Sequence, residues 1–501
     1  MREPYLAARV LDALLRENYG GLAERVTRSR DGVALVLADG RSVRLAAGVF
    51  QDFVVAPGEL LGLEQVLHTL AELADEEDAE GVAAFFEECV EALAGLELLD
   101  SHRPAVLGSS LADYETLAAF VDHPIYPTSR ARSGLSEADL LAYAPEFAPS
   151  FELRWAAVRV APGSAVHRPA DAAPWWPSAE DVGLPKDPGI PGKADTHALF
   201  PVHPLSLGEV ERIEGVVVAP DSYLLVRPTL SMRTVAVDER THLKLPLATS
   251  TLGRLNRRSI KPATLDDGAR AELLVRELAD PGVLVADEQT YGHAGHEYLA
   301  WMIRKLPAGR IVPVAALPQV MPEALGDYLR LLLRWNVRLF VEYGVALEAH
   351  QQNLAVVVTD DVLKLLVKDN DGLLASPSRL AAAGVKVPDF ADERMLTDDP
   401  HALADVFVTI TLHLAATAVA SAVLPADAAA RLVRDTLTEA LAEHGDHPMA
   451  KLLRARTLDA ARLTGKSMIT AGTLKTKQRS GARDINKFYG TSGPNYLRRS
   501  S

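Results

Sequence analysis

A concentration of polar side chains stands directly before an apolar, strand-like run in the second half of the chain. Residues 348–353 are EAHQQN, the runs LAVVV and VLKLLV follow, and residues 368–372 are KDNDG. If the two runs form a hairpin, the chain returns Asp369 close to Asn353. The carboxylates of Glu348 and Asp369 and the amide oxygen of Asn353 are then the ligand types that Mg²⁺ prefers. A solvated loop with turn-capping Asn and Asp residues is the alternative interpretation.

A second segment, RPTLSMRT at residues 227–234, carries side chains suited to phosphate and leads to HLKLPL. Residues two apart share a face of an extended strand, so Ser231 and Arg233 would point the same way. His242 and Lys244 would share a face in the next strand. Arg supplies a planar donor fork and Lys a point charge, and both suit a triphosphate. The same alternation is common on exposed strand faces, so this segment alone decides nothing.

A third segment, TSTLGRLNRRSIK at residues 249–261, places four cations after a run of hydroxyls. It could bind a polycarboxylate or phosphates, or it could be a capped helix start with a solvated basic face. Two histidines precede prolines, His123 and His203, and such residues are commonly hydrogen-bonded within a turn. No GxSxG, HExxH or Walker A motif is present, so the sequence gives no support to hydrolase, zincin or P-loop classes.

The elements that must position these residues follow from the hydrophobic spacing. Helical periodicity dominates the first 120 residues, with a hairpin signal at Asp39-Gly40. Residues 215–247 contain four short apolar runs separated by turns, which predicts an antiparallel sheet. The spacing predicts helices over residues 323–345 and 401–465, on either side of the LAVVV–VLKLLV hairpin. This order predicts a mixed α+β fold.

Bulk composition limits the classes of function. The chain has 501 residues, which is too many for one hydrophobic core, so two or three domains are expected. The net charge of −15 argues against a nucleic-acid partner. A single cysteine, Cys89, excludes an internal disulfide and a thiolate zinc site. We see neither a secretory signal nor an apolar run of the about 20 residues that a membrane span needs. A cytoplasmic protein without a membrane partner is expected.

Taken in order, these motifs resemble those of the IucA/IucC-type siderophore synthetases, which work without a peptide-synthetase template. The shared motifs are HPIYPTSRARSGLSEADLLAYAPEF, FPVHP, TLSMRT, HLKLPL, TST…R, EAHQQN and KDNDG, with KSMITAGTLK nearer the C-terminus. The resemblance implies a multi-domain cupped hand: a mainly helical thumb (residues 1–120), fingers with an antiparallel sheet (121–322) and a helix-rich palm with the metal-binding hairpin (323–501). It also implies a homodimer, with ATP and Mg²⁺ bound between fingers and palm.

The resemblance further implies a role for individual residues. The nucleotide would be bound by Ser231, Arg233, Thr234, Lys244, His350 and Gln352. The metal ligands would be Glu348, Asn353 and Asp369. The carboxylate substrate would meet His123, Thr249, Arg254 and Arg257, with His123, Lys244 and Arg254 acting in catalysis. An apparent one-residue shift in the TST…R segment leaves open which arginine, Arg254 or Arg257, contacts the substrate. At Tyr126 the family usually has a second histidine.

Members of this family adenylate a carboxylic acid, often citrate or a related acid, and release pyrophosphate. An amine or an alcohol then attacks the acyl adenylate, which builds an amide or ester of a siderophore or a related natural product. We therefore expect an ATP-dependent carboxylate–amine ligase with small-molecule substrates. A kinase-like small-molecule phosphotransferase is the alternative, although no glycine-rich phosphate loop and no HRD-type base supports it. A non-catalytic relative that binds a nucleotide or a polycarboxylate is the third possibility.

Overall fold

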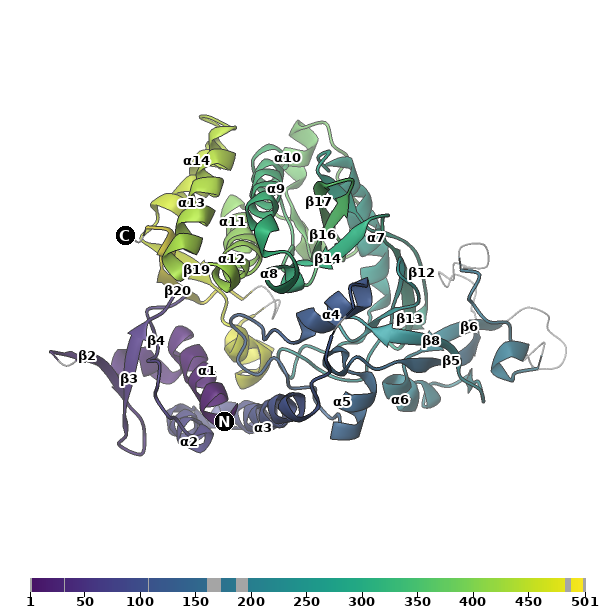
Figure 1. Ribbon diagram of the computed structural model, residues 1–501, viewed down its shortest axis with the longest axis horizontal. Helices are drawn as coiled ribbons and strands as arrows, with labels where there is room; N and C mark the ends of the chain where they lie inside the picture. Colours follow the sequence, from purple (N-terminus) through teal and green to yellow (C-terminus); the bar gives the residue numbers. More distant parts are fainter. Residues whose placement is uncertain are drawn as a thin grey trace.

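The chain is arranged in three regions around a central opening. The computed structural model describes residues 2–30, 32–106, 108–159, 173–185, 197–482 and 488–498. Figure 1 shows the N-terminal helices with a small sheet at one end, a large sheet at the other, and a helix-rich C-terminal region above them. We call these regions the thumb, the fingers and the palm.

The thumb is held by one hydrophobic core under a small meander sheet. Helix α1 (Arg2–Arg16) buries Leu6, Val10 and Leu14, whose spacing puts them on one face. The hairpin predicted at Asp39-Gly40 is confirmed, because β2 and β3 pair antiparallel. The other thumb elements are β1 (Val26–Ser29), β2 (Gly32–Val36), β3 (Ser42–Ala47), β4 (Phe53–Val55), α2 (Leu63–Leu73) and α3 (Ala79–His102).

The fingers contain an eight-stranded sheet whose described pairings are all antiparallel. The four runs predicted over residues 215–247 are strands, so that prediction is confirmed. The strands are β5 (Phe151–Arg159), β6 (His197–Val202), β7 (Val216–Val218), β8 (Tyr223–Pro228), β9 (Thr234–Ala236), β10 (Thr241–Lys244), β12 (Asp287–His296) and β13 (Leu299–Lys305). Helices α5 (Glu137–Tyr143), α6 (Leu207–Glu211) and α7 (Pro262–Glu277) accompany them.

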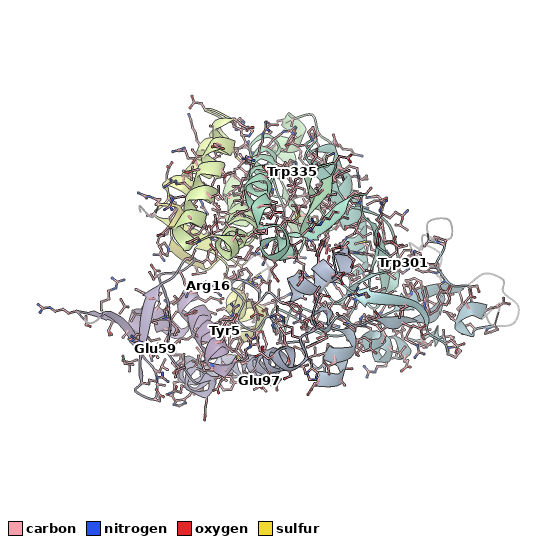
Figure 2. All side chains as sticks on the ribbon, in the orientation of Figure 1. Tyr5, Arg16, Glu59, Glu97, Trp301 and Trp335 are labelled. Carbon is pink, nitrogen blue, oxygen red and sulfur yellow. The ribbon has the colours of Figure 1, made fainter. Side chains whose placement is uncertain are left out.

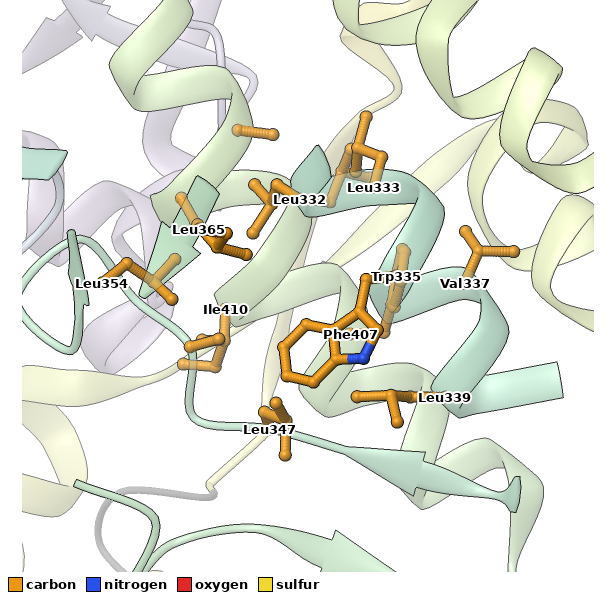
Figure 3. Packing of buried hydrophobic residues seen from close by; sticks show 14 of the residues in the cluster. Leu332, Leu333, Trp335, Val337, Leu339, Leu347, Leu354, Leu365, Phe407 and Ile410 are labelled. Atoms are coloured by element: carbon orange, nitrogen blue, oxygen red, sulfur yellow. The ribbon is translucent and has the colours of Figure 1, made fainter. Parts of the chain in front are cut away.

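The palm packs helices around a four-stranded sheet in the order β11-β17-β16-β14. The predicted hairpin is confirmed as β16 paired antiparallel with β17. Figure 3 shows Trp335 and Phe407 in its core, and Figure 2 places Trp335 in the palm and Trp301 in the fingers. The strands are β11 (Val283–Val285), β14 (Arg310–Pro313), β15 (Val345–Ala346), β16 (Leu354–Thr359), β17 (Val362–Val367) and β18 (Leu374–Ala375). The helices are α8 (Leu317–Val320), α9 (Leu325–Arg338), α10 (Pro377–Ala382), α11 (Pro400–Val406), α12 (Ala418–Val423), α13 (Ala426–Ala442) and α14 (Pro448–Arg454).

One palm helix is long and apolar enough to cross a membrane by length and composition. It covers Pro400–Val423, including the π-helical turns at Phe407–Thr417. This corrects the expectation that the chain lacks a run of that length. Within the described residues, 78% of its most apolar window is buried inside the protein. The packing of Phe407 and Ile410 into the palm core explains the composition.

Two segments join the three regions at the opening. Helix α4 (Leu111–Ala119) lies between β14 of the palm and β13 of the fingers in Figure 1. The C-terminal turn η12 (Thr470–Leu474) lies against the thumb, where Ile469 and Leu474 join the thumb core. The Glu17 carboxylate accepts hydrogen bonds from the backbone amides at the start of that turn, at 2.7–3.1 Å. The chain is therefore an α+β protein, as the element order predicted, and its C-terminal segment is part of the thumb. The remaining elements are β19 (Arg462–Gly465), α15 (Lys477–Ser480) and β20 (Thr491–Pro494).

Candidate active site

A deep cleft opens where the thumb, fingers and palm meet. It holds about 1260 Å³ of empty space, counted out to its open mouth. Five of the predicted site residues line it: His123, Ser231, Glu348, His350 and Gln352. They come from three separate motifs, so folding gathers side chains that are far apart in the sequence.

His123 is a half-buried, neutral imidazole at the wall of the cleft. Its Nδ1 accepts hydrogen bonds from the backbone amides of Tyr126 at 2.9 Å and Ile125 at 3.3 Å. Burial, with His350 and nearby cations, lowers the pKa of His123 to about 3. A neutral ring that accepts at Nδ1 carries its proton on Nε2. The side chain therefore provides an uncharged N–H donor at neutral pH.

His350 is held in the same state by the EAHQQN turn. Its backbone amide donates to the Glu348 carbonyl at 2.9 Å, and its Nδ1 accepts from the Gln352 amide at 3.3 Å. Burial, followed by the charge of Lys466, lowers the pKa of His350 to about 4. Two neutral imidazoles thus line the cleft, and neither is a charged partner for an anion at pH 7.

The TLSMRT loop joins β8 to β9 and takes a compact shape. Met232 has a left-handed backbone (φ 62°), and its amide donates to the Thr229 carbonyl at 2.8 Å. The Ser231 hydroxyl accepts from the Thr234 amide at 3.1 Å. Arg233 Nη1 donates to the Ser259 carbonyl at 3.1 Å. Ser231 therefore lines the cleft, while Thr234 is buried beneath it and shapes the loop.

Lys244 and Asp369 form a partly buried ion pair between fingers and palm, with Lys244 Nζ 2.6 Å from Asp369 Oδ1. Lys244 also lies 3.3 Å from Asp371 Oδ2. Burial alone would raise the pKa of Asp369, but Lys244, Arg304 and Arg233 together hold it far below its usual range. The backbone amide of Asp369 donates to the Glu288 carboxylate at 3.0 Å. Asp369 is therefore fully ionised at neutral pH.

The predicted metal ligands lie around a small pocket beside this pair. Glu348 and Asp369 both line it, and the Asn353 amide donates to the Glu348 carbonyl at 3.1 Å. A Cβ on Gly372 would lie 2.8 Å from the Glu348 carboxyl group, so a larger residue in the KDNDG turn would displace the Glu348 side chain from this position. Among the described residues no trio of His, Cys, Asp or Glu is placed to hold a metal. Because Mg²⁺ is usually bound by one or two carboxylates together with substrate phosphates and water, this oxygen donor set fits it.

Three residues predicted to contact the acid lie outside the cleft. Arg254 pairs with Glu87 at 2.8 Å and Arg257 with Glu297 at 2.9 Å, and both arginines are about half exposed. The Thr249 hydroxyl is buried and donates to the Ser133 carbonyl at 2.9 Å.

Arg258 lines the cleft instead. Burial, reinforced by Arg233, lowers the pKa of Arg258 to about 9. No carboxylate in the described part of the chain lies within ion-pairing distance of it. Arg258 is one of the four cations of the TSTLGRLNRRSIK segment, and no local pattern distinguishes it from the other three.

A close contact between two glycines helps to explain why Arg258 lines the cleft whereas Arg254 lies at the surface. The amide of Arg258 donates to the Thr249 carbonyl at 2.9 Å, which closes the residues between them into a loop that lines the cleft at Thr251 and Leu252. Gly253 in that loop has a φ of +115°, and a Cβ there would lie 2.9 Å from the backbone of Gly472. The Leu255 amide also donates to the Gly472 carbonyl at 2.9 Å. The loop is thus fastened to the C-terminal motif, and its tip carries Arg254 to the surface.

Sequence reasoning also missed several residues that line the cleft. The described lining includes Ser129, Arg130, Arg132, Thr251 and Lys466. Lys466 opens the KSMITAGTLK motif, which was the available signal. Its place in the cleft depends on the Glu17 contact with the following residues, and that contact joins opposite ends of the chain.

Comparison with known proteins agrees with this fold and site. Residues 110–319 match the model of the IucA / IucC family, and residues 325–483 match that of the ferric iron reductase FhuF-like transporters. The chain is 28% identical over 325 residues to the uncharacterized protein y4xN of Sinorhizobium fredii. It is 26% identical over 321 residues to an L-2,3-diaminopropanoate–citrate ligase of Staphylococcus aureus. The matched segments are about half of this chain, at 52% and 51%, and span about half the length of these relatives, at 51% and 53%.

Solved structures match over almost the whole chain. The petrobactin biosynthesis protein AsbB of Bacillus anthracis has a TM-score of 0.72 at 17% identity, covering 98% of this chain and 95% of its own. ATP-bound aerobactin synthetase IucA of Klebsiella pneumoniae has a TM-score of 0.69 at 16% identity, covering 98% and 99%. The fold is that of the siderophore synthetases, which confirms the predicted cupped-hand architecture. Residues 110–319 are thus similar to the IucA / IucC family, and the chain shares the fold of the aerobactin synthetases IucA and IucC.

Proposed function

We propose that this chain is an ATP-dependent ligase that activates a citrate-type carboxylic acid as an acyl adenylate and couples it to an amine or alcohol. The observation that carries the proposal is the position of the partly buried Lys244–Asp369 pair beside a cleft that is lined by Arg258, a cation with no carboxylate at ion-pairing distance among the described residues. The pair supplies a site for a metal–phosphate group, and Arg258 supplies a site for an acid. The relative of S. aureus named as a citrate ligase and the ATP-bound IucA structure support the same reaction class.

Two arginines, Arg258 in the cleft and Arg233 close to it, would attract an anionic substrate although the protein as a whole is acidic. Burial lowers the pKa of Arg258, and the nearby charge of Arg233 lowers it further. A bound anion between the two arginines would relieve their repulsion. A polycarboxylate offers several charges, and the neutral N–H donors of His123 and His350 can bind its further oxygens without changing their protonation. We therefore assign the acid-binding role to Arg258 in place of Arg254 and Arg257.

The chemistry requires charge neutralisation during the attack on phosphorus. A carboxylate oxygen of the acid attacks the α-phosphorus of ATP, the bond to the β-phosphate breaks, and pyrophosphate leaves. Arg233 and Lys244 are placed to stabilise the charge that builds on the phosphate oxygens. When bound by Glu348, Asn353 and Asp369, Mg²⁺ would supply further neutralisation of the leaving pyrophosphate. The amine or alcohol then attacks the activated carbonyl, loses a proton, and AMP leaves.

A kinase-like phosphotransferase is the second candidate, and one observation favours it. A loop between two antiparallel strands, a lysine on the third strand and an aspartate after a palm strand also surround Mg-ATP in protein kinases. The positions of Ser231, Lys244 and Asp369 match that arrangement. The products distinguish the two functions, because a ligase of this type forms AMP and pyrophosphate whereas a kinase forms ADP.

The experiment is a pyrophosphate-release screen with ATP and Mg²⁺ over citrate, 2-oxoglutarate and related acids, each with a panel of amines and alcohols. The proposal expects release that depends on the acid, with AMP formed in equal amount. Release of ADP with no pyrophosphate would favour the kinase. The expected homodimer stays a prediction, which sedimentation velocity would test. Cytoplasmic action without a membrane partner likewise stays an expectation, and the net charge of −15 is the reason to expect no nucleic-acid partner.

A further inference from the structure

We propose that Glu115 of α4 is a positioning residue, which holds the loop that carries Ser231 at a fixed distance from the turn that carries Asp369. This inference rests on the proposed function and names the residue that aligns the phosphate side of that site with its metal side. The Glu115 side chain is 1% exposed, so a ligand has almost no surface of it to contact. It can therefore act only through the groups that it binds.

Each carboxylate oxygen of Glu115 binds a different region of the protein. Oε2 accepts a hydrogen bond from the backbone amide of Leu230 at 2.9 Å, and Leu230 directly precedes Ser231 in the TLSMRT loop of the fingers. Oε1 accepts one from Nζ of Lys368 at 3.4 Å, and Lys368 directly precedes Asp369 in the KDNDG turn of the palm. Leu230 lines the cleft, and Lys368 lines the small pocket beside the proposed metal ligands. One buried carboxylate thus joins a residue of each space.

Helix α4 holds Glu115 against the palm. The neighbouring Tyr114 belongs to the palm core, and its hydroxyl accepts hydrogen bonds from Nη2 and Nε of Arg310 in β14, at 2.8 and 3.1 Å. Ala118, on the same helix face as Tyr114, belongs to the same core. Leu230 of the fingers loop packs against this core as well. Glu115 is therefore carried by a helix that is fixed to the palm, and from there it reaches the fingers.

The two contacts of Glu115 act on the proposed site residues through the backbone. The amide of Lys368 donates to the Asn353 carbonyl at 3.0 Å, so a displaced Lys368 would move both Asn353 and Asp369, two of the proposed metal ligands. A displaced Leu230 would in turn move Ser231. A triphosphate that binds on both sides needs the two sides at a fixed separation, because a misplacement of about 1 Å can lower a rate by about 100-fold.

An ion pair is a costly way to gain stability at this position. The side chains of Glu115 and Lys368 are 1% and 10% exposed, so both charges have lost most of their hydration. Well-packed apolar side chains are often as stabilising as such a pair. What the pair adds is a directed contact between two segments that are far apart in the sequence. Alignment of the two segments therefore explains the buried charges better than stability does.

The first test is hydrogen–deuterium exchange of the full chain without ligands, followed by mass spectrometry. Glu115→Ala removes both contacts, so amides of the TLSMRT loop and of the KDNDG turn should both exchange faster, by about tenfold or more. Glu115→Gln keeps an acceptor for the Leu230 amide but places an amide donor beside Lys368, so only the KDNDG turn should exchange faster. Thr116→Val is the matched control, because Thr116 is buried at the next position of the same helix, and it should leave both segments unchanged.

The second test is calorimetric titration of ATP into the full chain, with Mg²⁺ and with EDTA. Because both Glu115 variants release the metal side from the phosphate side, Mg²⁺ should increase the affinity for ATP by a factor about tenfold smaller than in the unaltered chain. The kcat of pyrophosphate release should fall by about 10- to 100-fold, with the KM for the acid changed by less than about threefold. Lys368→Met should show the same loss as Glu115→Gln, and the double variant should lose little more, since both changes remove one contact.

Unchanged exchange of both segments in Glu115→Ala would overturn the inference. An equal loss of ATP affinity with Mg²⁺ and with EDTA would also overturn it, because that pattern indicates a general loss of stability, and so would additive losses in the double variant. If Glu115→Ala fails to fold by circular dichroism, Glu115→Gln decides through the exchange of the KDNDG turn. The exchange measurement needs neither nucleotide nor acid, so a failure of the proposed function, seen as no pyrophosphate release by the unaltered chain, is distinguished from a failure of this inference.

Discussion

The Nζ atom of Lys244 lies 2.6 Å from Oδ1 of Asp369, although 125 residues separate them in the chain. The contact joins β10 of the fingers to the turn after β17 of the palm. A single ion pair therefore connects the two halves of the proposed nucleotide site.

Replacement of Asp369 by Asn should reduce acid-dependent pyrophosphate release by about 100-fold or more, since it removes a charge needed for the metal and leaves Lys244 without its closest partner. The control is Asp360→Asn, at the far end of the same hairpin, where asparagine tolerates the left-handed backbone (φ 49°). Release should be measured for both variants at saturating ATP. Near-normal release in Asp369→Asn would exclude the metal assignment.

Replacement of Arg258 by Ala should raise the acid concentration needed for half-maximal release by about 10- to 100-fold and change the ATP requirement less, because a charged hydrogen bond contributes about 1.5–3 kcal/mol. Arg254→Ala and Arg257→Ala remove surface ion pairs and should change the acid requirement by less than about threefold. If Arg254→Ala raised the acid requirement strongly and Arg258→Ala did not, the loop between Thr249 and Arg258 would have to rearrange when the acid binds.

The local elements of this site could be predicted from the sequence, because they depend on alternation and turn residues. The hairpin that returns Asp369 beside Asn353 is an example, and so is the antiparallel pairing that places His242 and Lys244 on one face. It could not be predicted that Arg258 is the arginine of this segment that lines the cleft, because its position depends on the contact between Gly253 and Gly472. No local pattern signals a contact over that separation.

The structure of the thumb could likewise be predicted only in part from the sequence. Its helices follow from apolar spacing, but its core is completed by Ile469 and Leu474 near the other end of the chain. The Glu17 carboxylate that fixes this segment is one acidic residue among many in the sequence. The domain boundaries at residues 120 and 322 remain predictions. Strand β11 belongs to the predicted fingers range, 121–322, yet it pairs with β17 of the palm, so contacts between regions cross the second boundary.

Tyr126, where the family usually has histidine, completes a buried network that should contribute to stability. Its hydroxyl donates to the Glu88 carboxylate at 2.8 Å, and the Thr473 hydroxyl donates to the same group at 2.7 Å. Burial raises the pKa of Glu88, so each donor matters. Tyr126→Phe should lower the free energy of unfolding by about 1–3 kcal/mol.

Urea denaturation followed by circular dichroism measures this loss. Tyr5→Phe is the control, because its hydroxyl contacts Asp122 at 2.7 Å on the surface, and its cost should be about 0.5 kcal/mol or less. Equal losses of unfolding free energy in the two variants would mean that the buried hydrogen bond of Tyr126 stabilises the fold no more than the exposed one of Tyr5.

The pH dependence of stability should reflect buried neutral histidines. Burial lowers the pKa of His203 to about 3, whereas an unfolded histidine titrates near about 6.5. Between these values the unfolded chain binds a proton that the folded chain does not. Stability from this group is therefore complete above about pH 6.5 and falls as the pH drops toward 3, by up to about 1.4 kcal/mol per pH unit.

His203→Asn should flatten that dependence. Asparagine can still cap the turn that His203 caps through the Leu205 amide, at 3.2 Å, but it does not titrate. Unfolding free energies at several pH values between about 4.5 and 7.5 should show a slope smaller by up to about 1.4 kcal/mol per pH unit. An unchanged slope in this variant would mean that His203 is protonated in the folded protein.

The central claim is that the site activates a carboxylic acid through its adenylate. The most direct measurement is quantification of all nucleotide and phosphate products after incubation with ATP, Mg²⁺, citrate and an amine panel. We predict AMP and pyrophosphate in equal amounts, dependent on the acid and lost in Asp369→Asn. Formation of ADP with a phosphorylated small molecule, and no pyrophosphate with any acid, would contradict it.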